Sequence, residues 1–405
     1  MKPWLSVVGI SEDGLAGLGS RARQALDHAE LVVGGARHLD LAEVSQTRRL
    51  VWPRPLEAAF PAILARRGTP ACVLASGDPL YYGVGSTLLK VVTRDEISFF
   101  PSLSSFSLAA ARLGWALQEC TCLSLHGRAL ERLIPTLQPG ARILALSWDQ
   151  TTPSVVATLL NERGFGDTRM IVCECMNGPR EHLRTTFATD FALTDIDPLN
   201  LIALEIPCQA RGRALPLSSG LSDDWFEHDG QLTRSDTRAI TLAALRPLQG
   251  ELLWDIGAGS GAIGIEWMLR APSMRALAIE PHADRAARIL RNALNLGVPD
   301  LQIIQGAAPE ALAALPTPDA IFIGGGASAP GVIETAWARL KPRGRLVINA
   351  VTLETQSLLA QHHGAMGGDI IQINLAQAAP VGRFHGWRAS MPIVQWRITK
   401  EPNLP

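Results

Sequence analysis

The sequence has no long apolar run and no excess of charge of either sign. None of its apolar stretches reaches the roughly 18 residues of a membrane-spanning helix, so no membrane partner is expected. Lys and Arg number 37 against 38 Asp and Glu, which leaves a net charge of −1. Because nucleic-acid-binding proteins usually carry a basic excess, this balance argues against a general nucleic-acid binder.

Cysteine is also scarce, and its spacing does not favour a metal site. The six residues are Cys72, Cys120, Cys122, Cys173, Cys175 and Cys208. Their C-x-C pairs lack the C-x-x-C spacing of zinc sites, and several lie in strand-like runs, so we expect buried, reduced thiols and no metal. The first six residues lack a signal-peptide cleavage pattern, and the expected location is therefore the cytoplasm.

The length of the chain indicates more than one domain. With 405 residues, two or three domains are expected, and a hydrophobic content of 47% with 36 glycines suits compact α/β domains. Residues 208–229 show little periodic signal and are the best linker candidate. Since no repeat relates the two halves, we predict unlike domains at residues 1–207 and 230–405.

A glycine-rich stretch organises the second domain. After a short apolar run that ends at Asp255, glycines alternate at Gly257, Gly259 and Gly261, and the pattern then turns helical. This order predicts a strand, a tight turn and a helix, with the backbone close to a ligand. Glu280 closes the next apolar run 23 positions after Gly257, where a second strand would offer a carboxylate to ribose hydroxyls.

Two families share this geometry, the dinucleotide enzymes and the S-adenosylmethionine (SAM) methyltransferases. The acid before G-x-G-x-G favours the second, because the G-x-G-x-x-G helix start is not followed cleanly. The number of predicted strands also resembles the class I, Rossmann-like SAM methyltransferase fold. The seven strands are expected at residues 251–256, 275–280, 301–305, 319–323, 345–350, 369–375 and 391–398.

The resemblance to class I SAM methyltransferases implies further cofactor contacts. Asp255 would accept hydrogen bonds from the turn amides or reach the amino group of SAM. Gly306 and Ala307, after the third strand, would present backbone amides to the adenine edge. Thr233 is expected near the cofactor, and Thr233 and Ser235 are expected to cap a helix over residues 239–245.

Two other segments of the second domain are candidates for contact with substrate. The fourth strand ends in three glycines at 324–326, which suits a large flat substrate, although a flexible surface turn is the alternative. Residues 377–388 are predicted to form a loop that carries Arg383, His385 and Arg388, our candidates for catalysis and for binding an acidic aromatic substrate. A solvated loop with incidental charges explains the same residues, and Arg238 is a further cation expected near the mouth.

In the first domain, strands alternate with helices up to residue 147, which argues for a largely parallel α/β sheet. After residue 152 the runs indicate a mixed α+β subdomain. The predicted strands lie at residues 4–9, 31–35, 70–76, 97–100, 121–126, 142–147, 169–175, 183–188 and 199–206, with helices at 20–29 and 154–162.

Residues 77–88 resemble the tetrapyrrole methylases (class III SAM methyltransferases), whose signature is G-D-P-x-x-Y/F after a strand. The resemblance implies a two-subdomain fold with SAM in the cleft between the subdomains, held largely by backbone. The residues carried over as cofactor-binding are Gly9, Gly77, Asp78, Ser104 and Ser105. Asp78 is either a catalytic base or a carboxylate that holds the turn. The loop at residues 9–14 departs from the glycine-richer pattern of the family.

Together and in this order, the two modules resemble the fused, decarboxylating methyltransferases of cobalamin biosynthesis. The resemblance implies methylation of precorrin-6B (precorrin-6Y) at carbons 5 and 15, with loss of the ring C acetate carboxylate, to give precorrin-8X. It implies one SAM per domain, a tetrapyrrole substrate and no metal, and we expect a homo-oligomer. The alternatives are an enzyme with one active module, a non-catalytic tetrapyrrole carrier and an RNA methyltransferase, which the charge balance disfavours.

Overall fold

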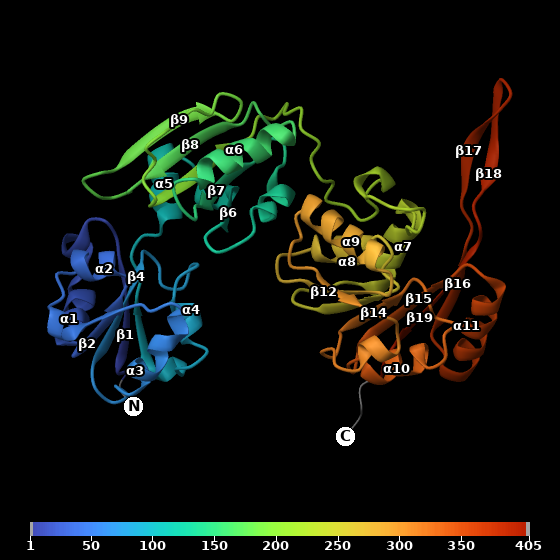
Figure 1. Ribbon diagram of the computed structural model, residues 1–405, viewed down its shortest axis with the longest axis horizontal. Helices are drawn as coiled ribbons and strands as arrows, with labels where there is room; N and C mark the ends of the chain where they lie inside the picture. Colours follow the sequence, from blue (N-terminus) through green and yellow to red (C-terminus); the bar gives the residue numbers. More distant parts are fainter. Residues whose placement is uncertain (1–2, 402–405) are drawn as a thin grey trace. The chain divides into compact units, whose positions relative to one another are not determined.

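The computed structural model describes residues 3–401 and divides into two units. The first unit comprises residues 1–130 and 136–213, and the second comprises residues 131–135 and 214–405. The expectation about a signal peptide rests partly on residues 1 and 2, which lie outside the described residues. Each unit is α/β in its architecture (Figure 1).

The first unit begins with a five-stranded parallel sheet in the order β3-β2-β4-β1-β5. Its strands are β1 (Leu5–Ile10), β2 (Leu31–Gly34), β3 (Arg49–Val51), β4 (Ala71–Ser76) and β5 (Ile97–Phe100). Its helices are α1 (Ser20–His28), α2 (Ala36–Leu41), α3 (Phe60–Leu64) and α4 (Gly85–Leu88). Strands β1 and β4 are apolar and buried throughout most of their length because hydrophobic clusters cover both faces of the sheet. Strand β3, a short edge strand, was not predicted.

A second, mixed sheet of five strands completes the first unit, in the order β6-β7-β10-β8-β9. Its elements are β6 (Cys120–Ser124), β7 (Arg142–Leu146), β8 (Arg169–Glu174), β9 (His182–Phe187), β10 (Asn200–Glu205), α5 (Ser105–Leu113) and α6 (Thr152–Glu162). The prediction that the mixed subdomain starts after residue 152 is wrong, because β6 and β7 already belong to this sheet. They pair with each other in parallel, so their local pattern matches that of the first sheet.

The second unit is built on a seven-stranded sheet in the order β13-β12-β11-β14-β15-β19-β16. The strands are β11 (Leu252–Ile256), β12 (Arg275–Glu280), β13 (Gln302–Gln305), β14 (Ala320–Ile323), β15 (Arg345–Ala350), β16 (Asp369–Ile373) and β19 (Ile393–Thr399). The first five are parallel, whereas β19 is antiparallel to both β15 and β16. All seven predicted strands are confirmed. The order and directions are those of the class I SAM methyltransferase fold.

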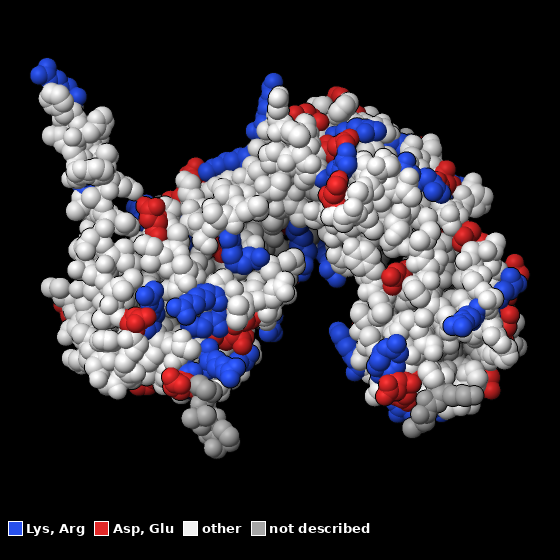
Figure 2. All heavy atoms as spheres, turned by 180° about the vertical axis from the view of Figure 1, so that it is seen from behind, with Lys and Arg blue, Asp and Glu red and all other residues white. Residues whose placement is uncertain are grey.

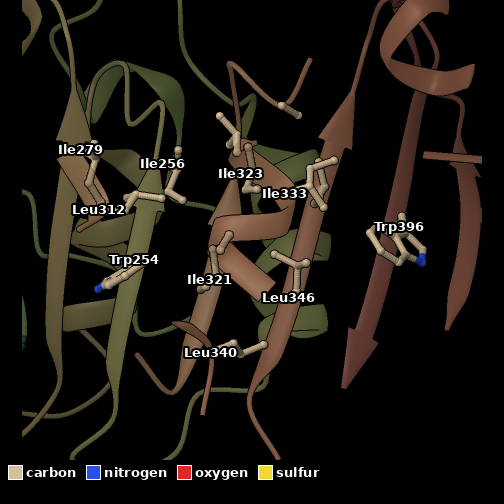
Figure 3. Close-up of a cluster of buried hydrophobic side chains, with 14 of the residues drawn as sticks. Trp254, Ile256, Ile279, Leu312, Ile321, Ile323, Ile333, Leu340, Leu346 and Trp396 are labelled. Atoms are coloured by element: carbon tan, nitrogen blue, oxygen red, sulfur yellow. The ribbon is translucent and has the colours of Figure 1, made fainter. Parts of the chain in front are cut away.

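Five helices belong to this sheet, and an apolar cluster lies on one of its faces. The helices are α7 (Ser235–Leu245), α8 (Ala262–Met268), α9 (Ala283–Asn295), α10 (Val332–Arg339) and α11 (Leu353–Met366). Figure 3 shows the cluster, in which Trp254, Ile321, Leu346 and Trp396 extend from successive strands. The two tryptophans are fully buried, and each donates its ring N–H to a backbone carbonyl, Trp254 to Pro316 and Trp396 to Gly367.

Residues 376–389 form a β-hairpin, not the predicted loop. Strands β17 (Ala376–Val381) and β18 (Phe384–Ala389) pair in antiparallel register and extend away from the main sheet of their unit (Figure 1). Polar and apolar residues are exposed on it alike, including Phe384 at 65% and Trp387 at 80% exposure. A strand buried on neither face has no apolar alternation that a sequence pattern could reveal.

Short 3-10 helices complete the described elements. They are η1 (Gly14–Gly17), η2 (Gln46–Arg48), η3 (Leu56–Ala59), η4 (Arg94–Glu96), η5 (Leu117–Glu119), η6 (Leu130–Thr136), η7 (Asp223–Trp225) and η8 (Glu310–Leu312).

Residues 220–234, which we call the strap, are ordered although most of them were predicted as linker. The predicted cap of α7 is wrong as well: its N-cap is Arg234, and no side chain of the cap residue makes the capping bond. Instead, Oδ1 of Asp223 accepts a hydrogen bond from the amide of Ser235 at 3.0 Å. The cap therefore comes from the strap, 12 positions upstream, beyond the reach of a local capping rule.

Candidate cofactor and substrate clefts

A cleft of about 980 Å³ opens in the second unit at the carboxyl ends of β11, β12, β14 and β15. Strand β11 lies between β12 and β14, so the chain winds in opposite directions on its two sides, the place where open parallel sheets bind ligands. The cleft gathers seven of the predicted cofactor-binding residues: Thr233, Asp255, Gly257, Gly259, Glu280, Gly306 and Ala307.

The glycine turn is shaped by a close backbone approach. Gly257 has φ +70°, and a Cβ there would lie 2.7 Å from the carbonyl oxygen of Gly325, in the turn after β14. Two turns at the ends of adjacent strands are thus packed backbone to backbone, which leaves room beside them for a ligand. Gly261, the remaining predicted glycine, is the N-cap of α8 and lies outside the cleft lining.

The two predicted acids of this cleft are buried and bonded to backbone amides. Asp255 accepts a hydrogen bond from the amide of Gly264 at 2.9 Å, not from the glycine turn itself. Glu280 accepts one from Gly259 at 2.9 Å and one from His282 at 3.1 Å, so it ties the glycine turn to β12. Burial, and then the charge of Glu280, raises the pKa of Asp255 to about 7.

These features fit SAM in its main chemical requirements. A buried carboxylate with a raised pKa is the group that a ligand cation stabilises, and SAM carries a cationic amino group. The oxygens of Glu280 retain lone pairs beyond those used by the two amides, which suits ribose hydroxyls. Backbone turns at Gly257 and Gly306 add close-packed walls without side-chain bulk.

The strap forms a wall of this cleft and is held by a buried ion pair. Residues 230–234 line the cleft. Glu266 accepts hydrogen bonds from the strap amides of Gly220 and Leu221 and from Nε of Arg238, at 2.7, 2.9 and 2.5 Å. Arg238 and Glu266 are fully buried, so the expectation of Arg238 near the mouth is wrong. Its guanidinium also stacks over Phe226 and donates to the carbonyls of Leu221 and Thr233.

The three candidate residues of segment 377–388 are not brought to the cleft. Arg383, His385 and Arg388 are exposed on the hairpin and are absent from the described linings of both clefts. Figure 2 shows basic atoms at the end of the hairpin, where Arg383 lies in the turn, and few charges along it. Gln377, at the base of β17, is the hairpin residue that lines the cleft.

Another cleft, of about 510 Å³, lies in the first unit and is lined by residues of both of its sheets. Gly77, Asp78, Ser104 and Ser105 line it, as predicted from the family resemblance. Gly9 does not. A Cβ on Gly9 would lie 1.7 Å from the carbonyl oxygen of Gly77, so its role is to let β1 and the turn after β4 touch.

In the cleft of the first unit, two residues carried over from the family resemblance stabilise backbone turns. Oδ1 of Asp78 accepts a hydrogen bond from the amide of Leu80 at 2.8 Å, which is the turn-holding role considered above. Oγ of Ser104 caps α5 by accepting from the amide of Ser107 at 3.1 Å. The geometry thus assigns both side chains to the shape of the cleft wall.

Several charged and aromatic residues line the cleft of the first unit without being among the predicted site residues, although Tyr82 belongs to the G-D-P-x-x-Y/F signature. They are Glu12, Arg37, His38, Tyr81, Tyr82, His126, Arg128 and Trp148. The side chain of Glu12 pairs with that of Arg37, and burial followed by the charge of Arg37 lowers the pKa of His38 to about 4. Glu12 belongs to the loop at residues 9–14, whose departure from the family pattern was the available signal.

Other features of the chain agree with a ligand-binding α/β protein. All six cysteines are free; Cys72, Cys173 and Cys175 are buried as expected, whereas Cys208 is exposed. Burial raises the thiol pKa of Cys72 and Cys173 to about 12. Within residues 3–401, no group of three or more His, Cys, Asp or Glu side chains is arranged to hold a metal. Nor does any helix in that range have the length and apolarity to span a membrane.

Fold and clefts together define a two-module SAM methyltransferase. The family model described as tetrapyrrole (corrin/porphyrin) methylases matches residues 5–192, and the one described as a precorrin methyltransferase domain matches residues 224–400. A Sinorhizobium protein named precorrin-6Y C(5,15)-methyltransferase [decarboxylating] is 51% identical over 401 residues, which cover 99% of this chain and 97% of the relative. The chain belongs to this family of fused precorrin-6Y methyltransferases, whose modules are of SAM-dependent kinds.

Two shorter relatives correspond to separate modules. A Salmonella typhimurium protein named cobalt-precorrin-7 C(5)-methyltransferase is 29% identical over 180 residues, covering 44% of this chain and 89% of the relative. Another from the same organism, named cobalt-precorrin-6B C(15)-methyltransferase (decarboxylating), is 31% identical over 176 residues, covering 42% of this chain and 91% of the relative. In that organism the two activities are named on separate proteins.

Proposed function

We propose that the chain transfers two methyl groups from SAM to precorrin-6B (precorrin-6Y), at carbons 5 and 15, and removes the ring C acetate carboxylate to give precorrin-8X in cobalamin biosynthesis. The observation that carries the proposal is the presence of two separate clefts, one at the G-D-P turn of the first unit and one at the glycine turn of the second. Membership of the fused family, reported above, supplies the substrate.

The proposed division of labour follows the two modules. The first unit methylates carbon 5, and the second methylates carbon 15 and releases carbon dioxide. Support comes from the Salmonella relatives, in which the C(5) name and the decarboxylating C(15) name belong to different proteins, each about half the length of this chain. Incubating the isolated residues 214–405 with precorrin-6B and SAM tests the division: one methylation with carbon dioxide release is expected, and release that needs residues 1–213 would contradict it.

The proposed methyl transfers require precise positioning of the reactants more than they require a strong base. SAM supplies an electrophilic methyl group when bound, and the meso carbons of a reduced tetrapyrrole are nucleophilic themselves. The role of the protein is to hold both partners in line at about 3 Å, which contributes much of the acceleration in reactions of this kind. In the second unit, Asp255 and Glu280 orient the cofactor, and the uncluttered turn at 324–326 leaves space for a flat ring.

We propose one SAM per module. Isothermal titration of the full chain with SAM is expected to show two sites. A single site supports an enzyme with one active module and one substrate-binding module, and no site supports a tetrapyrrole carrier. Product mass after incubation with precorrin-6B and SAM then tests the reaction: two added methyl groups and the loss of carbon dioxide are expected, and a product with one methyl group would refute the double methylation.

We also infer that the chain is a homo-oligomer. The hairpin exposes Val381, Phe384 and Trp387 at 64%, 65% and 80%, and an isolated two-stranded hairpin is at best marginally stable in water. Association through this arm would cover its apolar side chains. Sedimentation of the wild type and of Phe384→Ser with Trp387→Ser tests this, and the association is disproved by a wild type that sediments as a monomer at micromolar concentration.

A further inference from the structure

The cleft of the second unit is divided into a charged part and an uncharged part. Its ionisable lining residues all come from positions 223–285: Asp223, Arg234, Asp236, Asp255, Glu280, His282 and Arg285. The lining residues described after position 308 are all uncharged: Phe322, Gly324, Gly325, Gly326, Ala329, Asn349, Val351, Ile373, Leu375, Gln377, Ser390, Met391 and Ile393.

The cations in the charged part are already paired. Arg234 donates to Asp223 at 3.1 Å, and Arg285 donates to Asp229 at 3.0 Å. Asp236, at the start of α7, adds a negative charge. A substrate carboxylate at the uncharged part therefore meets side chains of β14, β15, β16 and β19 that carry no counter-charge.

Asn349 is the polar side chain on β15 in this part of the cleft, and its orientation is fixed by buried neighbours. Its Nδ2 donates to Oγ1 of Thr241 at 2.9 Å, and its Oδ1 accepts from Nε2 of Gln395 at 3.0 Å. Thr241 donates in turn to the carbonyl of Thr237 at 2.8 Å. Thr241 and Gln395 are fully buried, so the carboxamide is held from behind.

The network is incomplete within the described part of the chain. Oε1 of Gln395 is buried there without a hydrogen-bond partner, although buried polar groups are normally satisfied. The carboxamide of Asn349 also has a second N–H and a further lone pair beyond the two bonds it makes. The spare N–H of Asn349, which lines the cleft, can donate to a carboxylate, whereas the orphaned Oε1 of Gln395 is an acceptor outside the lining and does not bind one.

Resting on the proposed function, we propose that the carboxylate lost as carbon dioxide binds at this uncharged part of the cleft, where Asn349 positions it. In the step, the bond between the carboxylate carbon and the methylene carbon breaks, and its electron pair enters the conjugated ring. Carbon dioxide leaves, and the methylene carbon then takes a proton from solvent to become a methyl group.

The environment favours this step for an electrostatic reason. The charge is localised on the carboxylate at the start and is spread over the macrocycle as the bond breaks. A bound arginine or lysine would stabilise the starting carboxylate more than the delocalised charge, and so would slow its loss. The neutral amide N–H of Asn349 orients the substrate carboxylate but stabilises it less than a cation would. The apolar side chains of Phe322 and Ile393 limit its hydration.

The test uses the full chain with precorrin-6B, and measures carbon dioxide release and methyl transfer in the same reaction. Asn349→Leu is expected to lower carbon dioxide release about ten- to hundredfold, as for loss of a hydrogen bond to a charged group. The dissociation constant for SAM is expected to stay unchanged. Gln372→Leu, at an exposed position of β16 in the same sheet, removes an amide outside the cleft and is the matched control.

Asn349→Asp guards against a folding defect better than Asn349→Leu, because the carboxylate keeps the shape of the side chain and still accepts from Gln395, while both variants lose the hydrogen bond donated to Thr241. It is expected to lower carbon dioxide release further than Asn349→Leu, through repulsion of the substrate carboxylate, while its thermal unfolding temperature stays near that of the wild type. Unchanged release in both variants, or a matching rise in the SAM dissociation constant, would overturn the proposal. If the wild type itself transfers no methyl group and releases no carbon dioxide, the proposed function fails instead.

Discussion

The two clefts of this chain use their signature residues in different ways. In the first unit, Asp78 and Ser104 bond to nearby amides, and their contribution is the shape of the backbone. In the second, Asp255 and Glu280 place two buried carboxylates at the ends of adjacent strands. The comparison teaches that a signature residue can serve a cleft by shaping its backbone or by placing a buried charge, and the raised pKa of Asp255 makes the second arrangement sensitive to pH near neutrality.

The largest expected difference concerns the buried ion pairs of the two units. Arg238→Ala should lower the free energy of unfolding of the second unit by about 3–5 kcal/mol, because Glu266 is left buried and unpaired. The matched change is Arg184→Ala in the first unit, where Arg184 binds Glu174 but keeps 20% of its side chain exposed. Hydrogen exchange of peptides from each unit, followed in urea, should show the smaller loss for Arg184→Ala. Equal losses of unfolding free energy in the two variants would contradict the inference that full burial makes the Arg238–Glu266 pair the more important one.

Substitutions in the two glycine turns test whether the clefts bind SAM independently. Gly257→Val should weaken binding in the second unit at least about 100-fold, since its Cβ meets the backbone of Gly325 and its φ is +70°. Gly77→Val, with φ +54° and a Cβ 2.7 Å from the carbonyl of Leu103, should do the same in the first unit. Titration calorimetry should find one remaining site in each variant. Loss of both sites in either one would break the independence of the modules.

The pH dependence of SAM binding should differ between the units. Because the pKa of Asp255 is about 7, its ionised fraction rises from about a tenth at pH 6 to about nine-tenths at pH 8, and affinity for the SAM cation in the second unit should rise about tenfold. Asp255→Asn should flatten this rise, and the first unit should not show it. Calorimetry on Gly77→Val and Gly257→Val isolates the two sites.

The raised pKa of Asp255 also makes the stability of the folded protein depend on pH. This pKa is raised above the usual value of 3.8, so the folded state holds the proton more tightly than the unfolded state. The stability of the wild type relative to Asp255→Asn should therefore fall as the pH rises from about 4 to 7. Urea unfolding at pH 5 and pH 8 measures the difference, and a wild type that gains relative stability at pH 8 would contradict the assignment.

The smallest expected effect comes from the open turn after β14. A Cβ on Gly325 would make no contact shorter than 3.9 Å, so Gly325→Ala should fold normally. The added methyl group intrudes on the space for substrate, and we expect kcat/KM for carbon 15 methylation to fall about tenfold, as for small changes of pocket volume, with SAM binding unchanged. Gly364→Ala on α11, with open space at its Cβ, is the control. Equal activity of both variants would favour the flexible-turn interpretation of residues 324–326.

Local patterns predicted the elements that carry the clefts. The strand ends at Asp255 and Glu280, and the turns at Gly77 and Gly257, were all placed from the sequence because each depends on neighbours within a few positions. The contacts that orient a cleft side chain depend on partners far along the chain, and these contacts were not predicted. Asn349 is oriented by Thr241 and Gln395, which are 108 and 46 positions away, and no local period signals such a contact.

The sequence by itself determined the order of the two modules, the seven strands of the second and the positions of both ligand turns, since apolar period, glycine and a strand-end acid are local properties. Only the tertiary structure decided that Arg238 forms a buried ion pair instead of lying on the surface, and that residues 376–389 form an exposed hairpin. It also decided that the cleft of the second unit has a charged and an uncharged wall. The reason is physical: burial and pairing are properties of a side chain's surroundings, and those surroundings are assembled from distant segments only when the sheet forms.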